Sequence, residues 1–186
     1  TGCSLKNLMT ALDTDTIAAI ATARGDGPVG IIRLSGPKAL TIATTISQHH
    51  FEPRHAHLCV FTSACGDVID SGLGLYFPLP HSFTGEDVVE LQIHGGHIVL
   101  QALLSRCLEL GARAARPGEF SERSFLNGKI DLLQAEAIAD LISAETKAAA
   151  QLAASSLAVV FSAPVDTLTP HINELRSLTQ HHLELP

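Results

Sequence analysis

The sequence changes character at Pro117, and this change restricts the folds that the chain of 186 residues can adopt. Before Pro117, short apolar runs typical of strands are separated by glycine and proline turns, with two helical patterns interspersed. After it, the pattern is helical almost without interruption. We therefore predict an α+β protein with an N-terminal extension over residues 1–15, a mixed domain over 16–117 and part of an all-α domain over 118–186.

The mixed domain contains more strand patterns than helix patterns. Two helices are expected, one from Pro37 to about Ser47 and one over residues 97–110 that stops at Gly111. Residues 78–87, rich in proline, glycine and short polar side chains, are expected to form a loop. Strands are expected at residues 16–23, 29–35, 57–62, 88–94 and 112–115, with two more near a turn at 67–70 and 72–77.

The all-α part opens with clear helix signals. Asp131 and Gln134 are spaced as in a capping box. The apolar residues that follow recur on one helical face: Ala135, Ile138, Ala139 and Ile142. A second, alanine-rich helix is expected over residues 145–161.

The end of the chain predicts an interrupted helix and an unfinished domain. Pro164 and Pro170 should bend or break the helical run, because proline inside a helix costs about 3 kcal/mol. An apolar seam in the last helix requires a partner helix and is made by Val165, Leu168, Ile172 and Leu175. We therefore expect the chain to be a fragment.

Composition excludes several classes of function. With 12 basic and 19 acidic residues, the net charge of −7 argues against a broad nucleic-acid surface. The four cysteines and ten histidines show no metal-site spacing, so we expect reduced thiols and no metal. No apolar run of about 18 residues occurs, so we expect a cytoplasmic protein without a membrane span. Because Met9 is the only methionine, residues 1–8 are expected to lie upstream of the natural start.

Three residues are candidates for ligand contacts. Arg33, flanked by apolar residues in a strand, either faces outward at an edge or points at an anionic ligand. Glu90 lies in an apolar strand and needs a partner, which is either an internal arginine or the amino-pyrimidine edge of a ligand. Lys129 has no acidic neighbour except the helix-capping Asp131. His94 with two following glycines is a weaker signal for anion binding.

The charged connector at residues 116–129 has two interpretations, a ligand site or internal ion pairs. We interpret Arg116, Glu119, Glu122 and Arg123 as holding the junction of the two parts together, and Lys129 as facing a ligand. No catalytic residue is assigned, because the chain lacks a GxGxxG turn between a strand and a helix, a GxSxG motif and a Cys–His dyad at a readable spacing. The one Gly-Lys pair, Gly128-Lys129, lacks the other residues of a phosphate-binding loop.

Several long motifs resemble the N-terminal part of the bacterial tRNA modification GTPases, the MnmE (TrmE) family. The matching runs are TIAAIAT, VGIIRLSGP, LYFPLPHSFTGEDVVELQIHGG and ARPGEFSERSFLNGKIDLLQAEAIADLISAET, which lie between about residues 15 and 160. The chain departs from the family at its first turn and at Ile93 and His97, where the family usually has glycine and proline.

The resemblance implies a fold similar to the tetrahydrofolate-binding domain of aminomethyltransferases. It also implies a homodimer that binds 5-formyl-tetrahydrofolate or a related folate, with Arg33, Glu90 and Lys129 at the positions of the family's folate contacts. In the family, a G domain binds GTP with Mg²⁺ and K⁺, and an FAD-dependent partner, MnmG (GidA), joins in modifying carbon 5 of the tRNA wobble uridine. This chain lacks the G domain and is not expected to hydrolyse GTP.

Two other interpretations of the same residues stay open at this point. The first is a stand-alone folate-dependent one-carbon transferase, although no general acid or nucleophile is identified. The second is a non-catalytic scaffold in which Arg33, Glu90 and Lys129 form a buried ion network.

Overall fold

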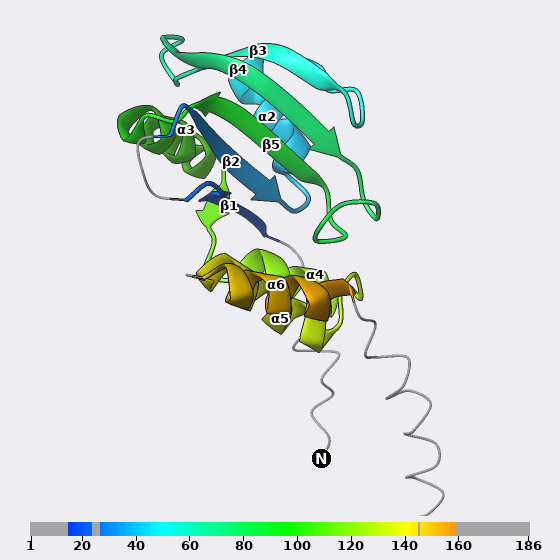
Figure 1. The fold of residues 1–186 in the computed structure, drawn as a ribbon. Helices are drawn as coiled ribbons and strands as arrows, with labels where there is room; N and C mark the ends of the chain where they lie inside the picture. The colour runs from blue at the N-terminus through cyan, green and yellow to red at the C-terminus, as the bar shows by residue number, and fades with distance from the viewer. Residues whose placement is uncertain (1–14, 24–26, 145, 159–186) are drawn as a thin grey trace, which may run out of the picture. The chain divides into compact units, whose positions relative to one another are not determined.

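The computed structural model describes residues 15–23, 27–144 and 146–158 (Figure 1). The chain divides into two compact units, residues 1–129 and 130–186. The first contains a mixed sheet with helices and the second contains helices, so the predicted α+β class is confirmed. The domain boundary expected after Pro117 stays a prediction. The division of the chain into two compact units falls after Lys129.

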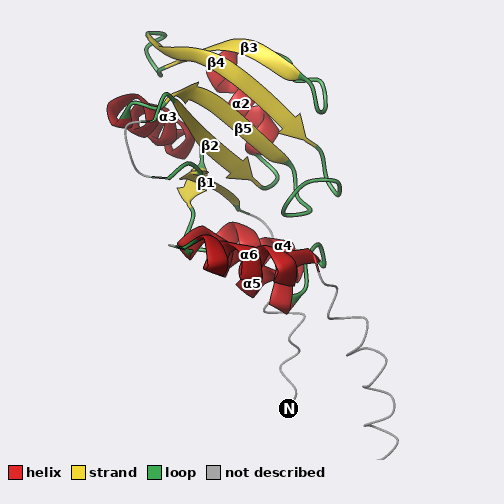
Figure 2. Cartoon of the chain, viewed as in Figure 1, coloured by secondary structure: helices red, strands yellow, loops and turns green. Residues whose placement is uncertain are grey.

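A single sheet of six strands organises the first unit, in the order β3-β4-β5-β2-β1-β6 (Figure 2). Neighbouring strands are antiparallel, apart from β1 and β6, which are parallel. The strands are β1 (Thr16–Ile20), β2 (Val29–Ser35), β3 (Ala56–Thr62), β4 (Val68–Phe77), β5 (Val88–His94) and β6 (Ala112–Ala114). The bounds of β2 and β5 are those expected from the sequence.

The expectation of two short strands at residues 67–70 and 72–77 is wrong, because β4 runs through both without a break. Glycine usually weakens a strand, but here it makes room for close neighbours. A Cβ on Gly72 would lie 1.9 Å from the carbonyl oxygen of Gln92 on β5, and one on Gly74 would lie 2.2 Å from Cε1 of Phe51. The glycines therefore allow the strand to pass close to β5 and to a core ring.

β1 is also shorter than predicted and ends at Ile20 rather than Ala23. The chain still follows β2 for one more residue, since the amide of Ala21 donates to the carbonyl of Ile31. At Thr22 the side-chain Oγ1, rather than a backbone carbonyl, accepts the hydrogen bond from the amide of Ile31, 3.4 Å away. A side-chain contact thus replaces the backbone ladder where the strand was expected to continue.

The core lies between one face of the sheet and two helices, α2 (Ala39–Ser47) and α3 (His97–Glu109) (Figures 1 and 2). Alternate residues of β2 and β5 are fully buried in this cluster, as the period of two in a strand requires. They pack against apolar helix residues: Ile32, Leu34, Val89, Leu91 and Ile93 meet Ile42, Ile46, Leu100 and Leu103. The intervening positions, which include Arg33 and Glu90, face the other side of the sheet.

The second unit contains α5 (Leu132–Ser143) and α6 (Lys147–Ala158). The predicted capping box is confirmed: the Asp131 carboxylate accepts from the amide of Gln134 at 2.7 Å, and the Gln134 side chain accepts from the amide of Asp131 at 2.9 Å. The expected break near Pro164 and Pro170 and the seam after it lie outside the described residues.

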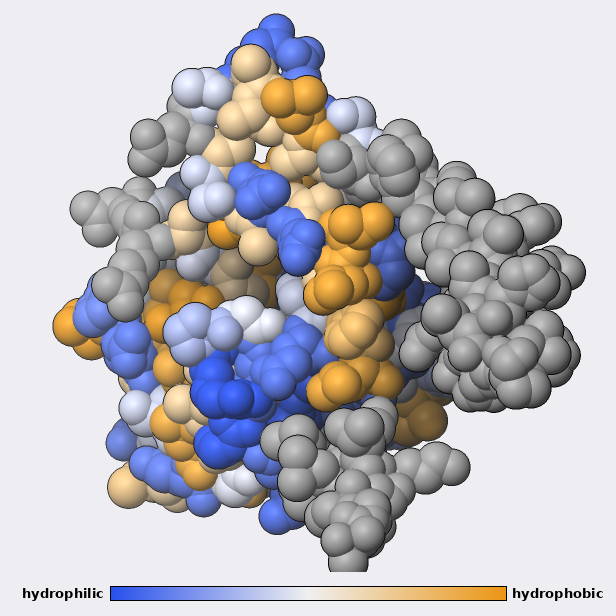
Figure 3. Space-filling model, turned by 90° about the horizontal axis from the view of Figure 1, so that it is seen from below, coloured by the Kyte–Doolittle hydropathy of each residue, from blue (hydrophilic) through white to orange (hydrophobic). Residues whose placement is uncertain are grey.

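Apolar side chains of the second unit reach solvent. Ile142 is 82 % exposed, although it lies on the face that the sequence pattern marks as apolar. Figure 3 shows hydrophobic residues in orange at the surface on the face that it draws. No helix among the described residues is long and apolar enough to cross a membrane.

A substitution in β4 tests the close packing of the sheet. Gly74→Ala should lower the free energy of unfolding by about 1–3 kcal/mol, because the added methyl overlaps the Phe51 ring in the core. Tyr76, the one tyrosine of a chain without tryptophan, reports urea unfolding by its fluorescence. Ser71→Ala on the exposed part of the same strand is the control; equal stability of the two variants would contradict the packing.

Candidate functional site

An arginine–carboxylate pair lies in the middle of the sheet, on the face away from α2 and α3. Arg33 of β2 and Glu90 of β5 are directly opposite each other in the antiparallel register. The Nε and Nη2 atoms of Arg33 donate to Oε1 of Glu90 at 2.9 and 2.7 Å. The side chains are 29 % and 17 % exposed, so the pair is partly shielded from water but reachable from solvent.

The second carboxylate oxygen of Glu90 is in a different situation. Both hydrogen bonds from Arg33 end on Oε1, and Oε2 accepts none from any residue that the structure describes. One acceptor oxygen of Glu90 is therefore unused among the described residues, while Arg33 holds the carboxylate in place.

Two phenyl rings lie beside this pair, and sequence reasoning missed both. The Cζ atom of Arg33 is 5.6 Å from the centroid of the Phe83 ring and 5.8 Å from that of Phe120. Guanidinium groups interact favourably with aromatic rings at such distances. Phe83 comes from the loop between β4 and β5, and Phe120 from α4 (Glu119–Leu126). The one sequence signal was that each phenylalanine stands in a polar segment, where packing in the core does not explain it.

Lys129 lies against the same loop and makes no direct contact with Arg33 or Glu90. Its amide donates to the carbonyl of Ser124 at 2.8 Å, which fixes the backbone just after α4. Its side chain is exposed and pairs with no carboxylate among the described residues. A Cβ on Gly85 would lie 3.2 Å from Cγ of Lys129, so the lysine stem runs alongside the loop that carries Phe83. The structure thus joins two of the predicted residues directly and the third through this loop.

The segment expected to be a charged connector contains a helix, α4, and most of its charges are paired internally. Glu119 is 2 % exposed and accepts from Arg113 at 2.6 and 3.1 Å and from the amide of Arg116 at 2.7 Å. The hydrogen bonds from Arg113 outweigh the opposing effect of burial and lower the pKa of Glu119 to about 2. Arg116 also pairs with Glu122 at 2.9 Å.

Arg123 is the second centre of this network, with a side chain that is 7 % exposed. It donates to the carboxylate of Asp15 and, at 3.0 Å, to Oε1 of Glu86. Burial alone would lower the pKa of Arg123, but these two carboxylates raise it. Ser35 of β2 donates to the other oxygen of Glu86 at 2.5 Å. The network holds α4 against β2, the β4–β5 loop and the residue before β1, which confirms the interpretation of these charges as internal pairs.

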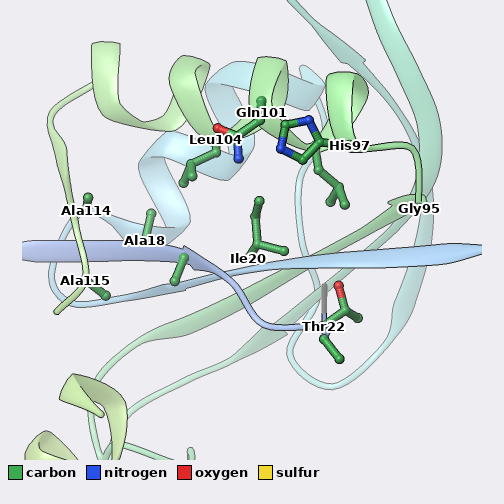
Figure 4. Close-up of a pocket in the computed structure, with 12 residues that line it drawn as sticks. Ala18, Ile20, Thr22, Gly95, His97, Gln101, Leu104, Ala114 and Ala115 are labelled. Atoms are coloured by element: carbon green, nitrogen blue, oxygen red, sulfur yellow. The ribbon is translucent and has the colours of Figure 1, made fainter. Parts of the chain in front are cut away.

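A separate cavity lies on the opposite side of the sheet (Figure 4). Its volume is about 620 Å³, and Ile20 of β1 faces His97, Gln101 and Leu104 of α3 across it. None of the three predicted ligand residues lines it. The cavity is therefore distinct from the Arg33–Glu90 pair.

The remaining chemistry-bearing residues form no catalytic or metal group in the part of the chain that the structure describes. No cluster of three or more His, Cys, Asp or Glu side chains could hold a metal ion there. Burial raises the pKa of Cys107 to about 12, so this thiol is unreactive. His94, singled out for its two following glycines, is 76 % exposed and pairs with Asp70 through Nδ1 at 2.9 Å.

Comparisons with known proteins give one consistent result. The profile of the family described as GTP-binding protein TrmE N-terminus matches residues 16–129. The chain is similar to the tRNA modification GTPase MnmE of Pseudomonas paraeruginosa, with 58 % identity over 93 % of this chain and 38 % of that protein. It is 57 % identical to the protein of the same name from Stutzerimonas stutzeri, over 92 % of this chain and 38 % of the relative. The relative from Dechloromonas aromatica is 55 % identical over 94 % of this chain and 39 % of its own length.

The buried Glu119 makes stability depend on acidic pH. Its folded pKa of about 2 lies below the ordinary value of 4.5, so its contribution is fully present above pH 4.5 and is lost as the pH falls toward 2. Glu119→Gln should cost about 2–3 kcal/mol of unfolding free energy at pH 7, and the difference from wild type should shrink between pH 4.5 and pH 2.

Urea unfolding followed by Tyr76 fluorescence at neutral pH and near pH 3 measures this difference. Glu122→Gln is the matched control, since Glu122 is 44 % exposed and pairs only with Arg116 among the described residues. It should change stability by about 0.5 kcal/mol or less. An effect of Glu119→Gln no larger than that of the control would be inconsistent with a buried, tightly paired carboxylate.

Proposed function

We propose that this chain, which belongs to the GTP-binding protein TrmE N-terminus family, is the folate-binding module of a tRNA modification GTPase. The observation that carries the proposal is the Arg33–Glu90 pair on the helix-free face of the sheet, with Oε2 of Glu90 available and the cationic Lys129 beside the adjoining loop. A ligand that matches this arrangement has a ring edge with N–H donors at one end and an anionic tail.

Reduced folates such as 5-formyl-tetrahydrofolate have both features. The pterin ring carries an amino group next to a ring N–H, and Glu90 accepts from this edge through Oε2, with Oε1 shared with Arg33. The glutamate tail carries carboxylates, for which the exposed Lys129 ammonium is a suitable partner. Arg33 then acts on the ligand mainly by orienting Glu90, and its remaining Nη1 donor can reach a ligand carbonyl.

In this proposal, the module is one part of a longer, multidomain protein. The chain spans about 38 % of the length of the curated relatives it matches, so GTP, Mg²⁺ and K⁺ would be bound by a G domain outside it. It would work as a homodimer in the cytoplasm with the FAD-dependent partner MnmG (GidA), and the folate would supply the one-carbon unit for carbon 5 of the tRNA wobble uridine. The charge of −7 leaves most tRNA contacts to other parts of the complex.

One observation favours a second candidate, a non-catalytic scaffold. Arg33 and Glu90 pair with each other without a ligand, as an internal ion pair would. In that case the pair would stabilise the sheet and bind nothing. A ligand titration separates the two candidates.

Isothermal titration calorimetry of the chain with 5-formyl-tetrahydrofolate tests the proposal. Glu90→Gln should weaken binding about tenfold or more, because the amide that replaces the carboxylate offers one acceptor and adds a repelling donor. Lys129→Gln should weaken binding about fivefold, and the loss should fall as salt is raised. Glu109→Gln, at an exposed pair with Arg106, is the control and should leave affinity unchanged.

The outcomes separate the candidates clearly. Heat of binding that is lost in Glu90→Gln and kept in Glu109→Gln supports the folate module. No binding by the wild-type chain at millimolar folate, or equal binding by all variants, would reject it in favour of the scaffold.

A further inference from the structure

The loop between β4 and β5, whose path Figure 1 shows, carries an aromatic residue, Phe83. The ring of Phe83 lies beside the charged pair. Phe83 is 38 % exposed, whereas Phe51 and Phe61 are 2 % and 0 % exposed in the core. The guanidinium of Arg33 lies 5.6 Å from the centroid of the Phe83 ring. Such a ring in a polar loop contributes little to folding and has the properties of a contact surface for a planar ligand.

Helix α4 and the residue after it hold the backbone on which this ring is mounted. The hydroxyl of Ser124 donates to the carbonyl of Phe83 at 2.7 Å. The side-chain amide of Asn127 donates to the carbonyl of Thr84, also at 2.7 Å. These two consecutive carbonyls are therefore held by side chains from one segment, and the backbone that carries the phenyl ring is fixed without a ligand.

The rest of the loop is anchored just as firmly. Thr84 is fully buried, and its hydroxyl lies 2.6 Å from that of Ser35 on β2. Asp87 accepts from the Tyr76 hydroxyl at 2.9 Å and from the amide of Leu79 at 3.1 Å. A loop with this many internal hydrogen bonds behaves as a rigid wall rather than as a flexible connection.

Gly85 ties this wall to the third ligand residue. Its φ of +79° lies in the left-handed region, and a Cβ there would lie 3.2 Å from Cβ of Asn127 and from Cγ of Lys129. The loop that carries Phe83 and the stem of Lys129 thus pack together without a gap for a side chain. The loop backbone and the Cγ of Lys129 are therefore held close together.

We propose that Phe83 is a ligand-stacking residue, held in place by Ser124 and Asn127, and that its ring forms a wall of the site against which a planar heteroaromatic ring packs. This inference rests on the proposed folate function and adds to it a contact that selects for flat rings. Arg33, on one side of the phenyl, orients Glu90, so stacking and edge recognition act on the same ligand ring.

Calorimetry of the whole chain with 5-formyl-tetrahydrofolate and with a pterin that lacks the p-aminobenzoyl-glutamate tail tests the inference. Phe83→Leu should raise Kd about fivefold for both ligands, and Phe83→Tyr should restore affinity to within about twofold of wild type. Phe125→Leu is the matched control, because Phe125, on α4, is similarly exposed at 41 % and has no ring contact with Arg33 among the described residues.

Ring stacking also has a spectroscopic signature that a merely structural role would not produce. The pterin protons should shift upfield on binding to wild type and to Phe83→Tyr, and the shift should be lost in Phe83→Leu even at saturation. Ser124→Ala together with Asn127→Ala should raise Kd and speed amide hydrogen exchange in residues 82–85 while the upfield shift persists in part.

Each result decides one question. Phe83→Leu with wild-type affinity, together with a loss of binding in Glu90→Gln, would overturn the stacking role and leave the folate function standing. Weaker binding in both variants, with an upfield shift in wild type that is absent in Phe83→Leu, supports both the stacking role and the folate function. Absence of folate binding by the wild-type chain would overturn both at once.

Discussion

The register between β2 and β5 is the constraint on which the rest of the first unit depends. Arg33 faces Glu90 and Ile32 faces Leu91 in adjacent rows of the same antiparallel pair. A slip by one residue would move every apolar side chain of a strand out of the core and carry the charged ones into it. The same pairing therefore builds the core on one face of the sheet and brings the two charged residues together on the other. A change of register would therefore disrupt the core and the charged pair together.

The two groups of charges near α4 are used differently. Glu119 and Arg123 are buried and surrounded by partners, so they stabilise the fold and are not available to a ligand. Lys129, a few residues further on, is exposed and has no carboxylate partner among the described residues. Burial with full pairing marks structural charges, and partial exposure with unused hydrogen-bonding capacity marks those that can bind something.

The sequence predicted the parts of the fold that depend on local periodicity and turn chemistry. The bounds of β2 and β5 and the capping box of α5 came from alternation and from Asp131 and Gln134, which act over a few residues. The continuity of β4 could not be predicted, because it depends on what Gly72 and Gly74 meet on other strands. Helix α4 falls in the part predicted to be all-α, but its bounds were not predicted, because its polar residues gave no apolar period and partners such as Arg113 stabilise it. In the site, Glu90 was identified because a carboxylate in an apolar strand needs a partner. Phe83 could not be identified from the sequence, because its position beside Arg33 depends on the path of the loop.

The contact between Asp15 and Arg123 joins residues at opposite ends of the first unit, 108 positions apart in the chain. Parallel pairing of β1 with β6 closes the sheet over a similarly long separation. During synthesis on a ribosome, strand β1 emerges before most of the first unit. Its outer edge stays uncovered until β6, near the end of the unit, has been made. At a synthesis rate of about 5–20 residues per second, that wait lasts several seconds. The outer edge of β1 is thus exposed during biosynthesis until β6 pairs with it. Helix α4, the last element of the unit to appear, then adds the contact of Arg123 with Asp15.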